Sequence, residues 1–356
     1  MPRRILLLIT DLEIGGTPTV VREVAIRLHV PPDVHVAVAC LAPAGPVAEQ
    51  LKAANVPVHA FGARSMRSAP RVLRHLIRHI GAGGFDTVFS FLVHANVMAA
   101  LASRFVSGVR FFQSIQTTQP NPAWHWRLQR RAARRAERIA VPSSAVAHAA
   151  RERSQIPAEK LVVIPNAVDA EQFRIDRDPP PGPFAVGFIG RLDPIKRLPD
   201  LLTAIKLLDG RARLHVFGEG EDRSRVEADV RRLGLESLVT LHGAIAQPQD
   251  ALRQLELLVL PSSAEGFGLV LIEAMAAGVP VVATDIPAAR DIVHHGETGL
   301  LVPVGSPEEL AAAIRRVMSD YSLRHRMAHR AQEDVRKRFA WDGVMRQYRA
   351  FLGIDS

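Results

Sequence analysis

Short apolar runs alternate with longer segments in which apolar residues recur at helical spacing. In the first half of the chain, the runs predict strands at Ile5–Ile9, Val34–Cys40, Val58–Phe61, Thr87–Phe91, Val109–Ser114, Ile139–Val141 and Leu161–Ile164. Strands that alternate with helices are typical of right-handed crossovers and of a parallel, doubly wound sheet. We therefore predict an α/β fold for this half.

A second alternation of the same kind follows a proline-rich segment, Asp176–Pro183, which we interpret as a linker. Its strands are expected at Ala185–Ile189, Leu214–Phe217, Val239–Leu241, Leu257–Leu260, Val281–Ala283 and Gly299–Val302. We therefore predict two Rossmann-like domains, residues 1–170 and 171–339, facing a cleft. Ligands of open α/β sheets bind beyond the carboxyl ends of the strands.

The stretch Leu257–Thr284 carries the clearest chemical signal. Glu273 is the only charged residue between Glu265 and Asp285, and its helix neighbours are apolar. Such a carboxylate is costly to bury without a partner, so a solvent-facing position is an equally good interpretation. Glu265 lies just before Gly266-Phe267-Gly268, where a helix should begin with free N–H groups that attract anions. We expect a polyhydroxylated, phosphate-bearing ligand there.

Three further loops follow predicted strands. Gly15-Gly16 lets a backbone approach a ligand, although a plain tight turn is the favoured interpretation of these two residues alone. Thr17-Pro18 suits the start of a helix. Arg191 and Lys196 are spaced to converge on one phosphate pair. Gly218, in the turn after another strand, is placed to approach a base or a ribose.

Composition narrows the function classes. The 356 residues carry a formal net charge of +9, with one cysteine. A single cysteine permits no internal disulfide, which fits a reducing compartment and a cytoplasmic location. No metal-ligand spacing is convincing, because Asp176-Arg177-Asp178 lies in the linker, and no nucleic-acid-binding motif is present.

The segment Trp124–Arg138 is strongly basic. We expect one helix over residues 122–138, with one cationic face that carries Arg127, Arg130, Arg131, Arg134, Arg135 and Arg138. A solvated helix face is one interpretation. The other is peripheral contact with anionic lipid at the inner face of a membrane, with Trp124 and Trp126 at the interface.

Taken together, these loops resemble glycosyltransferase family 4, retaining enzymes of the GT-B fold. The resemblance spans nearly the whole chain. It rests on Gly15-Gly16, residues 163–169 (VIPNAVD), Gly190-Arg191 with Lys196, Glu265-(x7)-Glu273, and residues 296–302 (GETGLLV). Each motif is weak by itself, but this order and spacing are highly specific.

The resemblance implies a retaining, metal-independent transfer of a sugar from a UDP-, GDP- or ADP-sugar to an acceptor hydroxyl. It implies that Arg191 and Lys196 neutralise the departing diphosphate, that Glu265 faces the donor sugar, and that Glu273 binds the ribose. The remaining implied donor contacts are Gly16, Gly218, Gly266, Phe267, Gly268, Leu269 and Val270. It also implies that residues 340–356 pack back onto the first domain, and that lipid-linked or polysaccharide intermediates are among the possible acceptors.

The chain departs from the family pattern at two positions. Gln116 stands where such enzymes often have a histidine, and glutamine cannot carry a proton charge near neutral pH. Arg197 replaces a common glycine after the lysine, which suggests an added phosphate contact. His94, at the preceding strand end, is either an acceptor-side residue or a structural one.

Two alternatives stay open from the sequence. One is an epimerase of nucleotide sugars or a glycosyl phosphorylase built on the same fold. The other is a basic protein that binds a membrane or a nucleic acid without catalysis.

Overall fold

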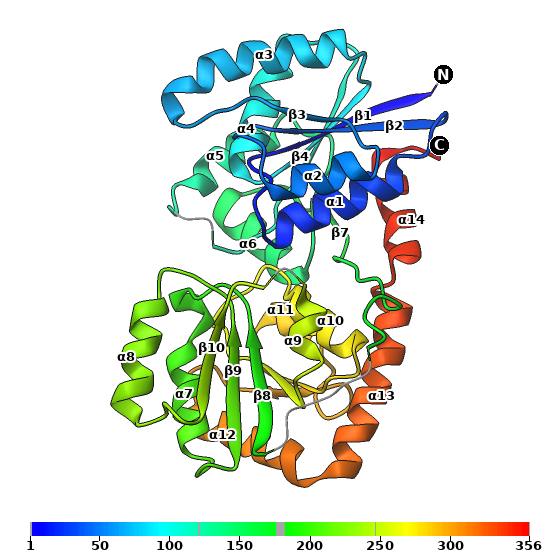
Figure 1. Ribbon diagram of the computed structural model, residues 1–356. Helices are drawn as coiled ribbons and strands as arrows, with labels where there is room; N and C mark the ends of the chain where they lie inside the picture. Colours follow the sequence, from blue (N-terminus) through cyan, green and yellow to red (C-terminus); the bar gives the residue numbers. More distant parts are fainter. Residues whose placement is uncertain (1, 120–121, 176–181, 246, 356) are drawn as a thin grey trace. The chain divides into compact units, whose positions relative to one another are not determined.

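The computed structural model describes residues 2–119, 122–175, 182–245 and 247–355. The chain divides into two compact units (Figure 1): residues 1–166 with 342–356 form the first, and residues 167–341 form the second. Each unit is built around its own parallel sheet, so the predicted fold of two Rossmann-like sheets is confirmed. Most of the expected linker, including Asp176 and Asp178, lies outside the described residues.

The first unit holds a seven-stranded sheet in the order β3-β2-β1-β4-β5-β6-β7. Its strands are β1 (Arg3–Ile9), β2 (Val34–Cys40), β3 (Val58–Ala60), β4 (Thr87–Phe91), β5 (Arg110–Ser114), β6 (Ile139–Val141) and β7 (Leu161–Val163). All of them pair in parallel. The chain first moves outward from β1 and then returns to β4 beside it, so the strand order reverses between β1 and β4. Ligand sites of doubly wound sheets lie at such a reversal.

Helices cover both faces of this sheet. They are α1 (Gly16–Leu28), α2 (Pro46–Ala53), α3 (Ala69–Ala82), α4 (Val93–Ala102), α5 (His125–Ala133), α6 (Ser144–Ser154) and the last helix, α14 (Trp341–Leu352). Helices α3 to α6 pack side by side in chain order, and α1 packs on α2. Helix α14 packs on the sheet, because Phe351 lies against Phe89 and Phe112 and Tyr348 lies against Phe89. Arg3 and Arg110 donate hydrogen bonds to the last carbonyls of this segment.

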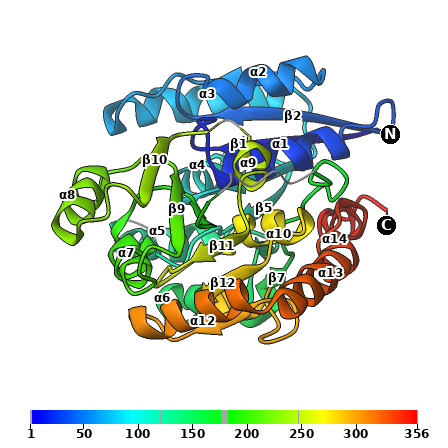
Figure 2. The same cartoon turned by 60° about the horizontal axis from the view of Figure 1, so that its bottom comes forward.

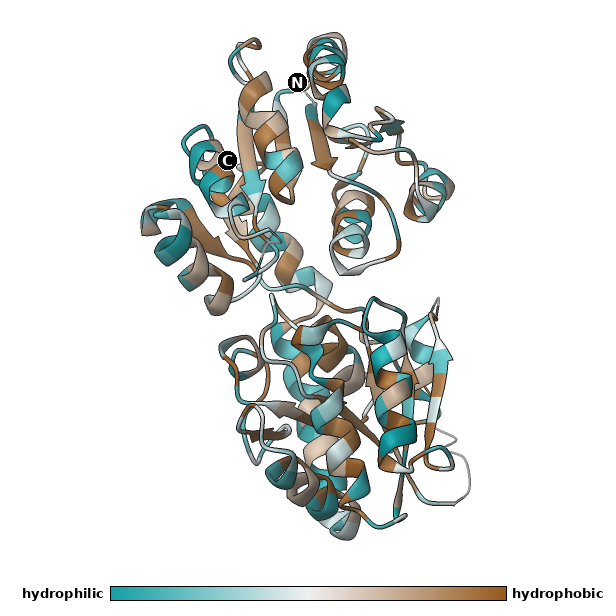
Figure 3. Cartoon of the chain, turned by 90° about the vertical axis from the view of Figure 1, so that its left-hand side faces the viewer, coloured by the Kyte–Doolittle hydropathy of each residue, from teal (hydrophilic) through white to brown (hydrophobic). Residues whose placement is uncertain are grey.

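The second unit holds a six-stranded sheet in the order β10-β9-β8-β11-β12-β13. Its strands are β8 (Phe184–Ile189), β9 (Ala212–Phe217), β10 (Val239–Gly243), β11 (Leu257–Leu260), β12 (Val281–Thr284) and β13 (Leu300–Val302). The strands at its centre are buried throughout. Figure 3 colours the chain by hydropathy, with hydrophobic residues in brown. Here the order reverses between β8 and β11, which places the loops that follow these two strands side by side.

Seven helices surround the second sheet. They are α7 (Leu198–Lys206), α8 (Arg223–Leu233), α9 (Pro248–Leu252), α10 (Leu269–Ala276), α11 (Pro287–Arg290), α12 (Pro307–Ser319) and α13 (Tyr321–Arg338). Helix α7 packs between α8 and α12, whereas α10 packs against α9 and α13 (Figure 2). Helix α10 is apolar on nearly all sides, since it lies between its neighbouring helices and the sheet.

The two units differ in charge. The first carries 23 arginines and lysines against 11 aspartates and glutamates, a formal net charge of +12. The second carries 22 against 25, a net charge of −3. The basic excess of the chain therefore belongs to the first unit alone.

The structure corrects the prediction for the basic segment. Helix α5 ends at Ala133, so Arg134, Arg135 and Arg138 do not share its face. The tryptophans also differ, because Trp124 is 50% exposed whereas Trp126 is 5% exposed and packs in the core with Ile115 and Val146. An interface role for Trp126 is therefore wrong. The prediction relied on the spacing of the arginines alone, which extended the helix beyond its true end. It also overlooked that Trp126 and Gln129 lie on the buried side of this helix.

Two smaller points complete the fold. Helix α1 begins at Gly16, capped by Gly15, so Thr17 is not its cap. Among the helices of the described segments, none combines the length and apolar character that crossing a lipid bilayer demands.

Candidate functional site

The start of helix α10 lies at the carboxyl end of β11. Gly268 adopts a left-handed conformation, with φ of 102°, and the helix begins at the next residue. The N–H groups of Leu269 and Val270 stand in the first turn, where no intrahelical carbonyl is available to them. Phe267 is buried and packs edge-on against Phe339, which anchors the turn. The geometry is that of a helix N-terminus open to an anion.

Lys196 and Glu265 meet at this helix start. The Lys196 Nζ lies 2.6 Å from the Glu265 Oε1, and both side chains are largely buried. Lys196 follows β8 and Glu265 follows β11, which are neighbouring strands of the sheet. The reversal of strand order therefore brings together two residues that are 69 positions apart.

Further hydrogen bonds hold this pair in place. The Ser262 hydroxyl donates to the same Glu265 Oε1 at 2.6 Å, and the Thr284 hydroxyl donates to the Ser262 carbonyl. The Ser263 N–H donates to the Ile195 carbonyl at 2.8 Å, which ties the loop after β11 to the loop after β8. Ser262 and Thr284 were not singled out in the sequence. Their signal is positional, because each lies at or just beyond the carboxyl end of a buried strand.

Glu273 lies on helix α10 among fully buried apolar neighbours. Its side chain is half-buried, and its carboxylate has no hydrogen bond or ion pair within the described part of the chain. Burial raises the pKa of this carboxyl group to about 7. A carboxylate left in this state costs free energy unless a ligand donates hydrogen bonds to it. Glu273 is thus partly buried, and its contact with a ligand stays a prediction.

The two arginines of the loop after β8 differ in their contacts. Arg191 is 74% exposed in its side chain and pairs with Asp193 at 2.6 Å. Arg197 has a φ of 51°, the left-handed region that favours glycine, and both its Nε and Nη2 donate to Asp200. The Arg197 guanidinium therefore stabilises the start of α7, and the expected phosphate contact gains no support.

Position 218 requires glycine because the neighbouring loop leaves no room for a side chain. A Cβ at this position would lie 1.9 Å from the Gly190 carbonyl oxygen, and the φ of Gly218 is 146°. Gly220 is similarly close to the Leu192 carbonyl. The loops after β8 and β9 thus pack backbone against backbone. This close packing explains the glycines without any ligand, so the expected approach of Gly218 to a base or a ribose stays a prediction.

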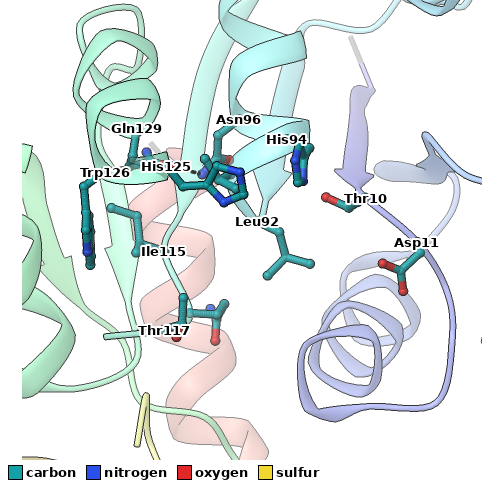
Figure 4. A pocket seen from close by; sticks show the side chains of 12 residues that line it. Thr10, Asp11, Leu92, His94, Asn96, Ile115, Thr117, His125, Trp126 and Gln129 are labelled. Atoms are coloured by element: carbon teal, nitrogen blue, oxygen red, sulfur yellow. Dashed lines mark hydrogen bonds between the residues drawn. The ribbon is translucent and has the colours of Figure 1, made fainter. Parts of the chain in front are cut away.

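The first unit contains a pocket of about 310 Å³ at the carboxyl ends of β1, β4 and β5 (Figure 4). Both acceptor-side residues expected from the sequence, His94 and Gln116, line it. Gly16, at the start of α1, is exposed and does not line this pocket. The complete lining is Thr10, Asp11, Leu92, Val93, His94, Asn96, Ile115, Gln116, Thr117, His125, Trp126 and Gln129.

A buried network of side-chain amides supports the floor of the pocket. Asn96 accepts a hydrogen bond from the Ser90 hydroxyl and donates to the Gln129 Oε1 at 2.9 Å. Gln129 in turn donates to the Gln113 Oε1 at 2.9 Å. These residues come from β4, β5, α4 and α5, so the network joins four elements across the sheet.

His125 faces His94 across the pocket. Their rings meet edge to face with centroids 5.0 Å apart, and His125 is 6% exposed. Burial, and next the proximity of His94, lowers the pKa of His125. His125 is therefore neutral around pH 7. The sequence analysis missed His125, Asp11, Asn96 and Gln129, although Asp11 lies in the loop after the first strand and Asn96 is a polar residue on an otherwise apolar helix.

No group of three or more His, Cys, Asp or Glu side chains arranged to hold a metal ion is found within the described ranges.

Two family models match the chain in succession. Residues 14–172 match Glycosyltransferase Family 4, and residues 169–334 match Glycosyl transferases group 1. Together they span both units.

Curated relatives agree with these matches. The chain is 31% identical over 330 residues to a phosphatidyl-myo-inositol mannosyltransferase of Mycolicibacterium smegmatis, covering 87% of this chain and 83% of that protein. It is 39% identical over 196 residues to an exopolysaccharide phosphotransferase of Streptomyces coelicolor, covering 54% of this chain and 20% of that protein. The chain spans only a fifth to about half of the length of the first curated relatives that it matches.

Solved structures support the same fold. The Anabaena protein Alr3699/HepE in complex with UDP-glucose superposes with a TM-score of 0.89 at 24% identity, covering 98% of this chain and 99% of that one. Sucrose-phosphate synthase from Thermosynechococcus elongatus superposes with a TM-score of 0.82 at 19% identity, covering 98% of each chain. At these identities the likeness concerns the fold, which is GT-B. With a relative at 31% identity over most of both chains, the protein belongs to glycosyltransferase family 4.

Proposed function

We propose that the protein transfers a sugar from a nucleotide diphosphate sugar to an acceptor hydroxyl, with retention at the anomeric carbon and without a metal ion. The observation that carries the proposal is the Lys196–Glu265 pair at the open N-terminus of helix α10. A cation beside free N–H groups suits a departing diphosphate, and the adjacent carboxylate suits the hydroxyls of a sugar.

In the proposed reaction the bond between the anomeric carbon and the diphosphate oxygen breaks. The acceptor oxygen forms its bond to the same face of that carbon, and its proton passes to the leaving phosphate. Lys196, Arg191 and the amides of Leu269 and Val270 stabilise the negative charge that develops on the diphosphate. Stabilisation of this kind raises turnover because it is strongest in the transition state.

In this proposal the Glu273 carboxylate binds the ribose of the nucleotide. Its half-buried carboxylate lacks a partner within the described segments, and two vicinal hydroxyls supply the hydrogen bonds that it needs. The other residues that we assign to the donor are Gly16, Gly266, Phe267 and Gly268. His94 and Gln116 belong to the acceptor side, because both line the pocket of the first unit.

The donor is tested first by thermal shift with UDP-, GDP- and ADP-sugars. We expect one base to raise the unfolding temperature clearly above the others. Stabilisation by none of them would contradict the proposal. Donor turnover is then followed with acceptors, with and without EDTA, and the anomeric configuration of the product is read by NMR.

The same assays separate the alternatives. An epimerase consumes the donor without an acceptor and releases no nucleoside diphosphate. A pyridoxal-dependent phosphorylase shows an aldimine absorbance band after purification. Inhibition by EDTA that is reversed by a divalent cation would contradict metal independence.

We further propose peripheral contact of the first unit with anionic lipid from the cytoplasmic side. The support is its net charge of +12 and the exposed side chains Trp124, Arg127, Arg130, Arg131, Arg134 and Arg135. Reversing Arg130 and Arg131 to glutamate should weaken sedimentation with phosphatidylglycerol vesicles at low salt. The matched control reverses Arg225 and Arg231, which are exposed on α8 of the acidic unit. An equal loss in both variants would contradict the proposal.

A further inference from the structure

The orientation of Gln116 in the pocket of the first unit is fixed by its neighbours. The Ser114 hydroxyl donates to the Ala140 carbonyl at 3.1 Å, which uses the only proton that this hydroxyl has. The Gln116 Nε2 lies 2.6 Å from the Ser114 Oγ and is therefore the donor of that contact. The Gln116 Oε1 remains as the acceptor atom of this side chain, which lines the pocket. Gln116 thus offers a ligand a hydrogen-bond acceptor.

Asp11 adds a carboxylate to the same lining. Its Oδ1 accepts one hydrogen bond, from the Glu13 N–H at 3.3 Å, and the rest of its acceptor capacity is open to a ligand. Burial, and next the charge of Asp11, raises the pKa of the buried Cys40 thiol to about 11. The negative charge of Asp11 therefore acts on neighbouring groups inside the protein. An anionic group bound in this pocket would be repelled by Asp11.

The lining offers no fixed positive charge to offset that repulsion. No lysine or arginine is among the pocket residues within the described ranges. Arg153 is exposed and donates to the Thr118 carbonyl, and neither residue is part of the lining. His125 is neutral because its burial lowers its pKa.

Apolar surface and unpaired hydroxyl and N–H groups complete the lining. Leu92, Val93, Ile115 and Trp126 form its apolar wall. The Thr10 Oγ1 and the Trp126 Nε1 are both buried without a hydrogen-bond partner among the described residues. A sugar or cyclitol ring matches this combination, since its C–H faces pack on apolar side chains and its hydroxyls both donate and accept hydrogen bonds.

We propose that this pocket binds the receiving end of the acceptor as an uncharged, hydroxyl-bearing ring, a glycosyl or cyclitol unit, and selects against a phosphate or carboxylate group on that ring. The proposal rests on the proposed glycosyl transfer and specifies its acceptor. At about 310 Å³ the pocket lies at the small end of ligand sites, which suits one ring rather than a longer chain.

Matched pairs of rings that differ by one phosphate test the selection. Suitable pairs are myo-inositol with inositol 3-phosphate, and methyl glucoside with its 6-phosphate. Release of nucleoside diphosphate is measured with the donor identified by thermal shift. We expect the neutral member of a pair to be used with a kcat/KM about tenfold higher or more. A preference for the phosphorylated members would overturn the proposal.

The Asp11→Asn variant sharpens the test, because the proposal predicts opposite changes in KM for the neutral and the phosphorylated ring. If Asp11 repels anions and accepts from hydroxyls, the variant raises KM for the neutral ring and lowers KM for the phosphorylated ring. Asp33→Asn, in an exposed residue outside the pocket, is the control and should change neither value. Unchanged KM values in Asp11→Asn, or a lower KM for the neutral ring, would overturn the proposal.

A second variant and a second readout keep this test separate from the proposed function. Trp126→Phe keeps the apolar ring and removes the unpaired N–H, so it should weaken only the neutral ring. Saturation-transfer NMR with the same pairs measures binding without turnover. Nucleoside diphosphate binding together with a preference for phosphorylated rings defeats the acceptor proposal alone. Absence of any nucleotide binding defeats the proposed function itself.

Discussion

The loop cluster around Lys196 and the pocket around Gln116 occupy equivalent positions in their sheets but use different chemistry. Both lie at the carboxyl ends of the strands where the strand order reverses. The cluster of the second unit is built from full charges, with Lys196 paired to Glu265 and an unpaired carboxylate at Glu273. The pocket of the first unit is built on neutral amides and one carboxylate. The difference is the one that our proposals require, with a charged donor in the second unit and an uncharged acceptor ring in the first.

Removing the ammonium group of Lys196 should have the largest effect on turnover. Lys196→Ala takes away the point charge nearest to the proposed diphosphate. We expect turnover to fall about 10²- to 10³-fold while the fold is retained. Steady-state kinetics measures this, and Lys206→Ala, in an exposed residue at the end of α7, is the matched control. Equal turnover in the two variants would remove Lys196 from the mechanism.

Breaking the amide network of the first unit should cost stability in that unit alone. Asn96→Ala leaves the Gln129 Oε1 and the Ser114 carbonyl without the donor that Asn96 supplies. We expect the free energy of unfolding of the first unit to fall by about 3 kcal/mol. Hydrogen exchange of the β4 and β5 amides reports this unit separately. Gln347→Ala, on the exposed side of α14, should stay within about 0.5 kcal/mol.

Backbone contact between loops can be tested at Gly218. Gly218→Ala places a Cβ against the Gly190 carbonyl, whereas Gly234→Ala, also at positive φ, meets nothing within 4 Å. We expect a loss of about 2 kcal/mol in the second unit for Gly218→Ala and about 1 kcal/mol for Gly234→Ala. Denaturant unfolding followed by hydrogen exchange separates the two values. Similar losses would mean that conformational strain, rather than the clash, explains Gly218.

The ionised Glu273 side chain should lower the stability of the folded protein and strengthen the binding of the nucleotide. Because burial raises its pKa to about 7, the folded state holds an extra proton between pH 4.5 and 7. Stability from this group is therefore complete below pH 4.5 and is lost as the pH rises through 7. Glu273→Gln removes this slope, so at pH 8 the variant should be about 1 kcal/mol more stable, discounted for partial exposure.

The same variant should weaken binding of the nucleotide about tenfold, since an amide accepts weaker hydrogen bonds than a carboxylate. Thermal unfolding at pH 5 and pH 8 and nucleotide titration at pH 8 check both effects. Glu236→Gln, in an exposed residue of the same unit, is the control. A variant that is destabilised at pH 8 would contradict the inward-facing carboxylate.

The elements around the proposed donor site could be predicted from the sequence because their signals are local. A strand, a glycine turn and an apolar helix follow one another within residues 257–276, so the start of α10 was predicted correctly. The pairing of Lys196 with Glu265 could not be predicted, since it depends on the contact between β8 and β11. Arg197 shows the same limit, because its hydrogen bonds to Asp200 became visible only in the structure.

The sequence by itself determined the two parallel sheets, the family and the helix start that favours an anion, because periodicity and motif spacing are properties of neighbouring residues. Only the tertiary structure decided that α5 ends at Ala133, that Trp126 packs in the core, and that the Gln116 Nε2 donates to the Ser114 hydroxyl. Each of these depends on residues from several elements that burial and hydrogen bonding bring together. The sequence therefore pointed to His94 and Gln116, whereas the other residues of their pocket were found only from the fold.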